Sequence, residues 1–464
     1  MTITLRPYQA QLLADIRAAF AEGHKRVLAV LSTGGGKTQI IAAVVQAAIA
    51  KGNRTLIVAH RAELISQLSA TVSSWGVPHG IIAPGYPMTD DLCQVASVQT
   101  AARRLDRMAE PALIVVDEAH HAIPGNQWGK LIERWPGAYV LGKTATPCRL
   151  SGEGLGQGHG GIFETMVLGP TAAWLTNNGF LAEADVYSIP SNLGKLHKRA
   201  GDYDMTEAAA SVVNLHGDAI KHFRLRIGRG TALAFCCTVE HSKRTVADFN
   251  AAGIPAASLD GTMAPEERRD ILARLRAREL KVVSSVGVLG EGLDVPGVNG
   301  CIMLRPTASL GLYLQMVGRA LRPKPDGSRA IILDHVGNAL RHGLPTDERE
   351  WSLEGTPKKK REAAVSVRVC PDCFAAMPSG TAICPACGVQ QATKQREIVT
   401  ADGDLQLITR KPERKPRPSA GAKTYEDLLR IEKERGYKPG WANHVASYRL
   451  ARRPGGRPRV GELI

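Results

Sequence analysis

Two short stretches of the chain carry the residue types that bind and hydrolyse a nucleoside triphosphate. Residues 32–38 read Ser-Thr-Gly-Gly-Gly-Lys-Thr and lie between an apolar run, residues 27–31, and an apolar stretch of helix length, residues 39–50. Glycines in such a loop let backbone N–H groups approach phosphate oxygens, and the N-terminus of the following helix adds positive potential. The loop therefore predicts a phosphate cradle, whose expected members are Thr33, Gly34, Gly35, Gly36, Lys37 and Thr38.

Within this cradle we expect Lys37 to reach the β- and γ-phosphates and the Thr38 hydroxyl to ligate Mg²⁺. The general spacing GxxxxGK[ST] asks for glycine at position 31, where this chain has Leu31. The alternative interpretation is a glycine-rich turn with an unrelated lysine. The order of apolar run, loop and helix favours the cradle.

A pair of carboxylates, Asp117 and Glu118, directly follows the apolar run of residues 112–116. The C-terminal end of a buried parallel strand is where α/β proteins form their sites. We expect Asp117 to hold Mg²⁺, directly or through water, and Glu118 to orient and deprotonate the attacking water. Taken alone, the pair could be a capped, solvated acidic loop, but the phosphate cradle upstream favours catalysis.

The elements that must position these residues follow an α/β pattern. Short apolar runs alternate with helix-length amphipathic stretches from residue 27 to about residue 333, which is typical of parallel sheets covered by helices. The expected strands are residues 27–31, 55–59, 112–116 and 138–142, then 231–235, 281–285, 301–304 and 330–333. We predict two tandem α/β domains, residues 1–188 and 189–345.

Residues 117–120 read Asp-Glu-Ala-His, and with this motif the chain resembles the superfamily 2 DEAD/DEAH-box helicases over about residues 3–343. The resemblance implies RecA-like domains, ATP and Mg²⁺ as cofactors, and a nucleic acid as partner. Residues 5–9 are similar to the family's adenine-reading element, which adds Arg6 and Gln9 to the nucleotide site, with Gln9 at the base edge. The same resemblance implies contacts to the nucleic-acid strand from His60, Arg61, Gln99 and Thr100. It also implies that the state of the nucleotide is coupled to nucleic-acid binding through His120, Thr144 and Thr146.

The second half carries two further family motifs. Residues 286–294 resemble motif V, which assigns Gly292 and Asp294 to the nucleotide site, and residues 315–322 match motif VI, QxxGRxxR, with Gln315, Arg319 and Arg322 as expected catalytic residues. Three residues apart on a helix, both arginines would share one face and could point across a domain cleft at one triphosphate. Such arginines raise the hydrolysis rate by roughly 10³–10⁵. The alternative is a surface helix with solvated arginines.

A four-cysteine segment follows the two domains. Cys370 and Cys373, then Cys384 and Cys387, form two CxxC pairs separated by ten residues. This spacing predicts a tetrahedral zinc site in a small module at residues 365–392. A redox pair is the competing interpretation, but redox CxxC motifs usually occur once and beside a βαβ unit.

The end of the chain is basic and contains aromatic residues. A Pro/Lys/Arg stretch predicts an extended linker at residues 393–422, and helical spacing returns in the tail, residues 423–464, where Thr424 and Asp427 stand at capping-box distance. Trp441 and Arg449 are candidates for stacking on unpaired bases and contacting phosphates. A helical hairpin that packs on the body or on a partner is nearly as well supported.

Composition agrees with a nucleic-acid partner. The 464 residues include 59 lysines and arginines against 44 acidic residues, a formal net charge of +15, and most of the excess follows residue 351. An acidic polymer is the partner that this balance suggests first. Long uncharged apolar runs are missing and Arg6 and Asp15 lie near the start, so we expect neither a membrane span nor a secretory signal.

Within the superfamily, the motor segments and the cysteine-rich module most resemble the RadD-like group and its phage and prophage relatives. This resemblance implies a cytoplasmic protein of a bacterium or phage-infected cell. It would act on single-stranded or forked DNA in repair, recombination or replication, with other replication or recombination proteins as further partners. RNA helicase, restriction-type motor subunit and ATP-switched adaptor without unwinding remain the alternatives.

Overall fold

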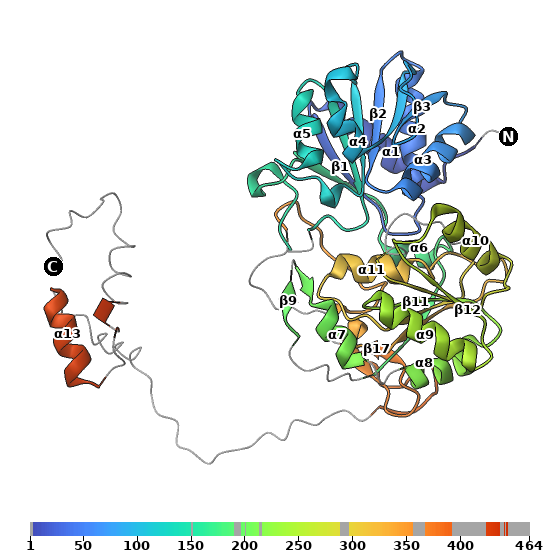
Figure 1. Ribbon diagram of the computed structural model, residues 1–464, viewed down its shortest axis with the longest axis vertical. Coiled ribbons are helices and arrows are strands. Elements are labelled where there is room, and N and C mark those ends of the chain that lie inside the picture. Colours follow the sequence, from blue (N-terminus) through green and yellow to red (C-terminus); the bar gives the residue numbers. More distant parts are fainter. Residues whose placement is uncertain are drawn as a thin grey trace. The chain divides into compact units, whose positions relative to one another are not determined.

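The computed structural model describes residues 3–149, 152–189, 196–199, 201–212, 216–287, 297–355, 367–391, 424–436, 440 and 442–443. The chain divides into two compact units, residues 1–393 and 394–464. The first unit contains two large parallel sheets and a two-stranded module, and the second contains helix α13 (Tyr425–Glu434) (Figure 1). The side chain of Thr424 accepts the backbone N–H of Asp427 at the start of α13, which confirms the predicted capping box.

The first sheet has seven parallel strands in the order β3-β4-β2-β5-β6-β1-β7. These strands are β1 (Arg26–Val30), β2 (Thr55–Ala59), β3 (His79–Ile82), β4 (Cys93–Ser97), β5 (Leu113–Asp117), β6 (Tyr139–Thr144) and β7 (Thr165–Leu168). The central strands are buried on both faces, as expected for a parallel sheet covered by helices. Because β1 and β5 lie on either side of β6, the phosphate cradle and the carboxylate pair emerge at the same sheet edge.

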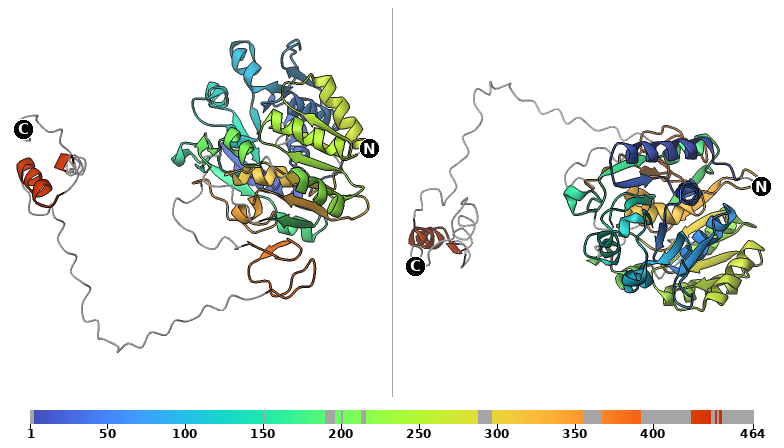
Figure 2. Two further views of the ribbon diagram at one scale, coloured as in Figure 1. Left: turned by 60° about the horizontal axis from the view of Figure 1, so that its bottom comes forward. Right: turned by 90° about the horizontal axis from the view of Figure 1, so that it is seen from above.

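Helices cover both faces of this sheet (Figure 2). On one face, α1 (Pro7–Ala21), α2 (Lys37–Ile49) and α3 (Ala62–Ser74) contribute to one apolar cluster. On the other, α4 (Val98–Arg103) and α5 (Gln127–Arg134) contribute to a second cluster. The short helical turns η1 (Leu105–Arg107), η2 (Ala119–His121) and η3 (Gln157–His159) lie in the connections.

The second sheet has six parallel strands in the order β12-β13-β11-β14-β15-β8. They are β8 (Ala184–Ser188), β11 (Ala232–Phe235), β12 (Ala256–Leu259), β13 (Val282–Ser285), β14 (Gly300–Met303) and β15 (Ala330–Asp334). Strand β8 pairs with β15, so the change from one sheet to the other occurs before Ala184, earlier than the expected boundary after residue 188.

Helix α6 (Ala172–Asn177) lies in the connection between the two sheets. The helices that follow β8 are α7 (Met205–Val212), α8 (His216–His222), the π-helical turn η5 (Phe223–Ile227), α9 (Val239–Ala251), α10 (Pro265–Arg276), α11 (Leu310–Gly318) and α12 (Asn338–His342). A small hairpin, β9 (Lys198–Arg199) and β10 (Asp202–Tyr203), precedes α7. The apolar cluster that contains α1 to α3 also includes Val317 and Leu321, so the two domains share a packed core.

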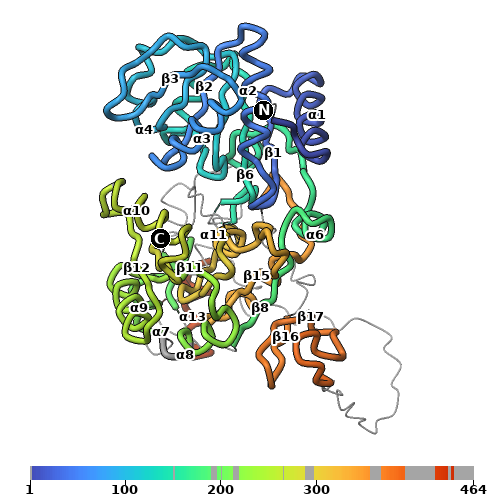
Figure 3. The backbone as a smooth tube through the Cα atoms, turned by 90° about the vertical axis from the view of Figure 1, so that its right-hand side faces the viewer, coloured from blue at the N-terminus to red at the C-terminus, as the bar shows by residue number. Residues whose placement is uncertain are grey.

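The two-stranded module, β16 (Val367–Val369) and β17 (Ala376–Pro378), lies beside β8 and α12 (Figure 3). Ser188 N–H donates to the carbonyl of Phe374 at 3.0 Å, and Tyr187 forms an antiparallel bridge with Ala375. The module is therefore attached to the second domain through backbone contacts. None of the helices in the described ranges is both long and apolar enough to cross a membrane.

Candidate active site

The phosphate cradle follows β1 and leads into α2, as the sequence predicts. Gly34 and Gly36 have left-handed φ angles of 87° and 80°, which side chains rarely adopt, and Gly36 is the N-cap of α2. A Cβ at Gly36 would lie 2.3 Å from the amide nitrogen of Gln9. Free backbone N–H groups at the start of α2, next to Lys37, fit the oxygens of a polyphosphate.

Lys37 is the partly buried cation of the cradle. Its ammonium donates to the carbonyl of Leu31 at 3.0 Å. Burial lowers the pKa of Lys37 to about 8, and the charge of Lys143 acts in the same direction. The charges of Glu118 and Asp117 oppose this shift, so both carboxylates lie close enough to Lys37 to influence it. The cradle and the acidic pair thus face one small volume.

The carboxylate pair stands at the end of β5. Asp117 is 2% exposed, and its Oδ1 accepts the backbone N–H of Glu118 at 2.8 Å. Glu118 has the left-handed backbone φ of 49°, which is uncommon for a residue other than glycine and turns the chain away from the strand. The two carboxylates, together with the hydroxyl of Thr38 in the first turn of α2, offer oxygen ligands of the kind that Mg²⁺ prefers.

A buried ion pair that sequence reasoning missed connects β5 and β6. Lys143 Nζ lies 2.8 Å from Asp117 Oδ1, and the two side chains are 8% and 3% exposed. The residues are direct partners across the parallel strands. Its signal in the sequence was a lysine within an otherwise apolar strand, immediately before Thr144, because a buried lysine requires a partner.

His120 joins the acidic pair to the end of β6. Its Nδ1 lies 3.1 Å from Thr144 Oγ1 and 3.4 Å from Glu118 Oε2. Thr144 Oγ1 in turn donates to the carbonyl of Thr146 at 3.0 Å and accepts its N–H at 3.1 Å. The expected coupling residues His120, Thr144 and Thr146 therefore form one hydrogen-bonded group, and His120 lies within ion-pair distance of Glu118.

The expected adenine-reading residues lie against the cradle. The amide of Gln9 donates to the carbonyls of Gly35 and Gly36 at 3.1 and 3.4 Å, and the hydroxyl of Tyr8 donates to Gly35 at 2.9 Å. The Arg6 guanidinium lies 5.1 Å from the ring centre of Phe180. The ring of Tyr8 contacts those of Phe180 and Trp174 edge to face, an aromatic group that the sequence motif did not reveal.

The motif VI residues lie on α11 and just beyond it. Gln315 is buried within the helix, Arg319 is its C-cap and 8% exposed, and the partly buried Arg322 follows the helix. The expectation that both arginines share one helical face is wrong, because α11 ends at Gly318. The charge of Arg319 nonetheless acts on the pKa of Lys37, which is lowered mainly by burial, so Arg319 lies near the cradle.

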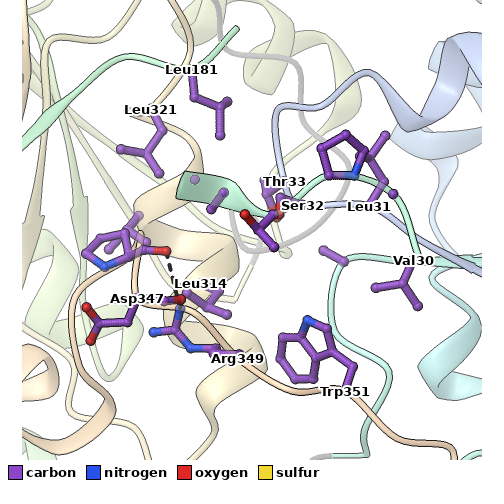
Figure 4. A pocket seen from close by; sticks show the side chains of 18 of the residues that line it. Val30, Leu31, Ser32, Thr33, Leu181, Leu314, Leu321, Asp347, Arg349 and Trp351 are labelled. Atoms are coloured by element: carbon purple, nitrogen blue, oxygen red, sulfur yellow. Dashed lines mark hydrogen bonds between the residues drawn. The ribbon is translucent and has the colours of Figure 1, made fainter. Parts of the chain in front are cut away.

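The domains also contact each other away from the cradle. Arg268 of α10 forms an ion pair of 2.8 Å with Glu63 of α3, and both side chains are largely buried. A cavity of about 100 Å³ lies beside the cradle, with Ser32 and Thr33 in its wall together with α11 residues (Figure 4). Arg349 and Trp351, which come from beyond the second sheet, line the same cavity.

The candidates for contact with the nucleic-acid strand lie near the turn that contains Asp117 and Glu118. The amide of Gln99 donates to the carbonyl of His60 at 3.3 Å, and Arg61 Nε donates to the ring of His60 at 3.2 Å. Thr100 is buried in α4. The ring centres of His60 and His121 are 4.9 Å apart, and those of His121 and His120 are 4.2 Å apart.

The four cysteines of the module converge. Their sulfur atoms all lie within 4.8 Å of one another, with 3.7 Å between Cys370 and Cys387 and 3.6 Å between Cys373 and Cys384. In a tetrahedron with metal–sulfur bonds of about 2.3 Å, sulfur atoms are about 3.8 Å apart, so the spacing fits a zinc ion. The amide of Gln391 donates to Cys370 Sγ at 3.3 Å, which supports a thiolate at that position.

Four candidate residues lie outside the described ranges. They are Gly292 and Asp294 of motif V, and Trp441 and Arg449 of the tail.

The fold and this geometry define a two-domain ATPase of RecA-like architecture. A family model described as Type III restriction enzyme, res subunit, matches residues 2–149, and one described as Helicase conserved C-terminal domain matches residues 216–324. A 51.5 kDa protein of a Lactococcus phage is 32% identical over 81% of this chain and 80% of its own length. The chain belongs to the superfamily 2 helicases, and it is an ATP-hydrolysing enzyme.

More distant relatives are also similar in sequence, and one solved structure is similar in fold. The DNA 3'-5' translocase XPB2 of Sulfurisphaera tokodaii is 25% identical over 73% of this chain and 83% of its own length. Two yeast relatives, from Saccharomyces cerevisiae and Schizosaccharomyces pombe, are each 26% identical, and the chain spans 51% and 59% of their lengths. A fragment described as an HsdR subunit of a type I restriction enzyme from Vibrio vulnificus has the same fold, with a TM-score of 0.57, 21% identity, and coverage of 73% of this chain and 67% of that one.

Proposed function

We propose that the chain is a DNA motor that uses ATP hydrolysis to move along or unwind DNA. In this proposal Lys37 and the α2 N-terminus bind the phosphates, and Asp117 and Thr38 hold the metal ion. Glu118 orients the attacking water and accepts its proton, while Arg319, Arg322 and Gln315 act from the second domain. The metal ion, when bound, neutralises charge on the phosphate oxygens.

The observation that carries the proposal is a continuous set of contacts from the strand-contacting candidates to the hydrolytic carboxylate. Gln99 is bonded to His60, His60 packs on His121, His121 packs on His120, and His120 lies beside Glu118. A nucleic acid that moves His60 would therefore also move the group that orients Glu118. Such contiguous contacts are a physical means of coupling two sites, provided that the elements have two arrangements.

The names of relatives favour DNA over RNA as the substrate. XPB2 is described as a DNA translocase, and the family model over the first domain is that of a restriction enzyme subunit. Motor motifs grip phosphates and do not by themselves read the sugar. RNA therefore remains the alternative that the experiment must exclude.

The four-cysteine module is proposed to hold one zinc ion in a structural role. All four positions of a tetrahedral site are filled by sulfur, which leaves no position open for a water molecule to react. The basic tail, with Trp441 and Arg449, is proposed to add contacts to single-stranded or forked DNA.

The test is ATP turnover measured with single-stranded DNA, duplex DNA, forked DNA and RNA, for the wild type and for Lys37→Ala. We expect DNA to raise turnover more than RNA does, and Lys37→Ala to lose activity with every nucleic acid. Failure of all four nucleic acids to stimulate turnover would remove the motor proposal. Strand displacement and translocation assays then separate a motor from an adaptor, because an adaptor would hydrolyse ATP without displacing a strand.

A further inference from the structure

The chain crosses from the second domain back to the first after α12. Residues 342–349 form a compact turn on the second domain, held by the guanidinium of Arg349, which donates to the carbonyls of His342, Leu344, Pro345 and Asp347. The next six residues, 350–355, are here called the strap. Trp351 and Leu353 of the strap pack on an apolar cluster whose buried members all come from the first domain.

The strap lies against the first domain and ends in a turn. Trp351, Leu353 and Gly355 are partly buried, while Ser352 and Glu354 are exposed. The N–H of Gly355 donates to the carbonyl of Ser352 at 3.4 Å, which closes the turn. Gly156 N–H donates to the carbonyl of Leu353 at 2.9 Å, and Glu153 forms an antiparallel bridge with Gly355. The strap is therefore fixed at its end by backbone hydrogen bonding as well as by apolar side chains.

Glycines make this close approach possible. A Cβ at Gly154 would lie 2.2 Å from the carbonyl oxygen of Leu353, and one at Gly355 would lie 2.4 Å from the nitrogen of Gly154. Distances this short to backbone atoms cannot be relieved by rotating a side chain. The glycine-rich residues 152–161 are thus the surface on which the strap lies.

The position of the strap relates it to catalysis. Arg349 and Trp351 line the cavity beside the cradle, together with Ser32, Thr33 and Gly318 (Figure 4). A second connection between the domains, through residues 169–183, contributes Gly169 and Leu181 to the same cavity. Two connections on one cavity limit the directions in which the domain that carries Arg319 can move relative to the cradle.

We propose that the strap is a positioning element for ATP hydrolysis. It keeps the second domain in those positions relative to the first domain from which Arg319 can reach the nucleotide. This inference goes beyond the proposed DNA function, because it concerns only the ATPase shared by the superfamily. Small losses of alignment in a reacting complex cost up to about 10²-fold in rate. Release of the strap should therefore lower kcat while leaving nucleotide binding to the first domain intact.

The test compares two substitutions in the same glycine-rich segment. Gly154→Ala places a methyl group against the strap backbone, whereas Gly158→Ala is its matched control, because a Cβ at Gly158 meets nothing within 4 Å and neither glycine has a positive φ. We expect Gly154→Ala to lose hydrogen-exchange protection at Gly156 N–H, to lower kcat on the order of tenfold, and to keep the Kd for a non-hydrolysable ATP analogue. Gly158→Ala should match the wild type in all three measurements.

A second pair of variants acts on the strap side. Trp351→Ala should repeat the loss of kcat at unchanged Kd, and Trp351→Phe should restore most of it, since an aromatic ring can still pack on the first domain. The proposal is overturned if Gly154→Ala releases Gly156 from protection and still turns over ATP at the wild-type rate. Retained protection in Gly154→Ala would overturn it as well, because the strap would then not depend on the close approach. Both results would be independent of which nucleic acid stimulates the enzyme.

Discussion

Gly318 of α11 lies directly against Thr33 of the phosphate cradle. A Cβ at position 318 would come within 2.6 Å of both the Cβ and the Cγ2 of Thr33. The last turn of the motif VI helix therefore touches the nucleotide loop of the other domain at a point where a single methyl group cannot fit. Arg319 is the next residue, so this contact sets how closely its guanidinium can approach the cradle.

Replacement of this glycine should separate the domains. We expect Gly318→Ala to bind a non-hydrolysable ATP analogue with nearly wild-type Kd and to lose turnover on the order of 10²-fold, because Arg319 is displaced. Steady-state ATPase assays with calorimetric binding measure both quantities. Gly380→Ala serves as control, since a Cβ there meets nothing within 4 Å. Equal kcat in the two variants would show that the contact is not needed for closure.

Arg319→Ala should keep ATP binding and lose turnover by about 10³–10⁵-fold, if the guanidinium stabilises charge on the transferring phosphoryl group. Single-turnover hydrolysis and analogue binding distinguish the two effects. Arg276→Ala is the control variant, because it also removes one arginine but does so on the exposed side of α10. Turnover in Arg319→Ala as fast as in Arg276→Ala would exclude Arg319 from the site.

Lys143→Met removes the cation paired with buried Asp117. We expect the free energy of unfolding in the absence of nucleotide to fall by about 3 kcal/mol, because an uncompensated buried carboxylate remains. Mg²⁺ with ATP should recover most of this loss and should saturate the variant at a lower Mg²⁺ concentration than the wild type. Calorimetric unfolding with and without Mg-ATP tests this, beside the exposed substitution Lys130→Met. Identical Mg²⁺ dependence in both variants would contradict the prediction.

Nucleotide affinity should fall at alkaline pH. Burial lowers the pKa of Lys37 to about 8, so its ammonium is charged below that pH and neutral above it. Phosphates bind the charged form, and the Kd for ATP should therefore rise above pH 8 by at most about tenfold per pH unit. Titration between pH 7 and 9.5 measures this, and Lys37→Ala should bind weakly without the same pH dependence. A flat profile for the wild type would place the Lys37 pKa well above this range.

Metal analysis of the purified protein should find one zinc ion per chain. Cys384→Ser should lose it, because three sulfur ligands and a hydroxyl bind zinc far more weakly than four thiolates. Cys148→Ser, outside the module, should retain it. A wild-type protein without zinc would leave the four sulfurs without an assigned role.

The regular parts of the fold were readable from sequence because their signals are local. Each of the eight expected strands is found, since runs such as residues 55–59 are apolar throughout and buried on both faces. The strands that were missed are short or polar: β12 contains Ser258, and β3 contains His79. Strand β8 was not expected, and the domain boundary after residue 188 left its residues in the first domain, because only the pairing with β15 shows that they belong to the second sheet.

The site divides in the same way. The phosphate cradle, the carboxylate pair and the four cysteines could be predicted because each is a set of residue types at fixed spacing. The structure brings the members of each set together. Lys143, Gly318 and the strap depend on contacts between residues far apart in the chain, for which spacing gives no information. The end of α11 at Gly318 was also missed, since the apolar pattern continues through Leu321.

The attachment of the cysteine module to β8 has a consequence for solubility. β8 is the last strand of its sheet, and a bare last strand offers unpaired N–H and C=O groups to any other chain. Phe374 and Ala375 already occupy part of this row through Ser188 and Tyr187. Without the proposed zinc ion the module would hold this strand less firmly, and molecules of the protein would then associate through β8 into aggregates.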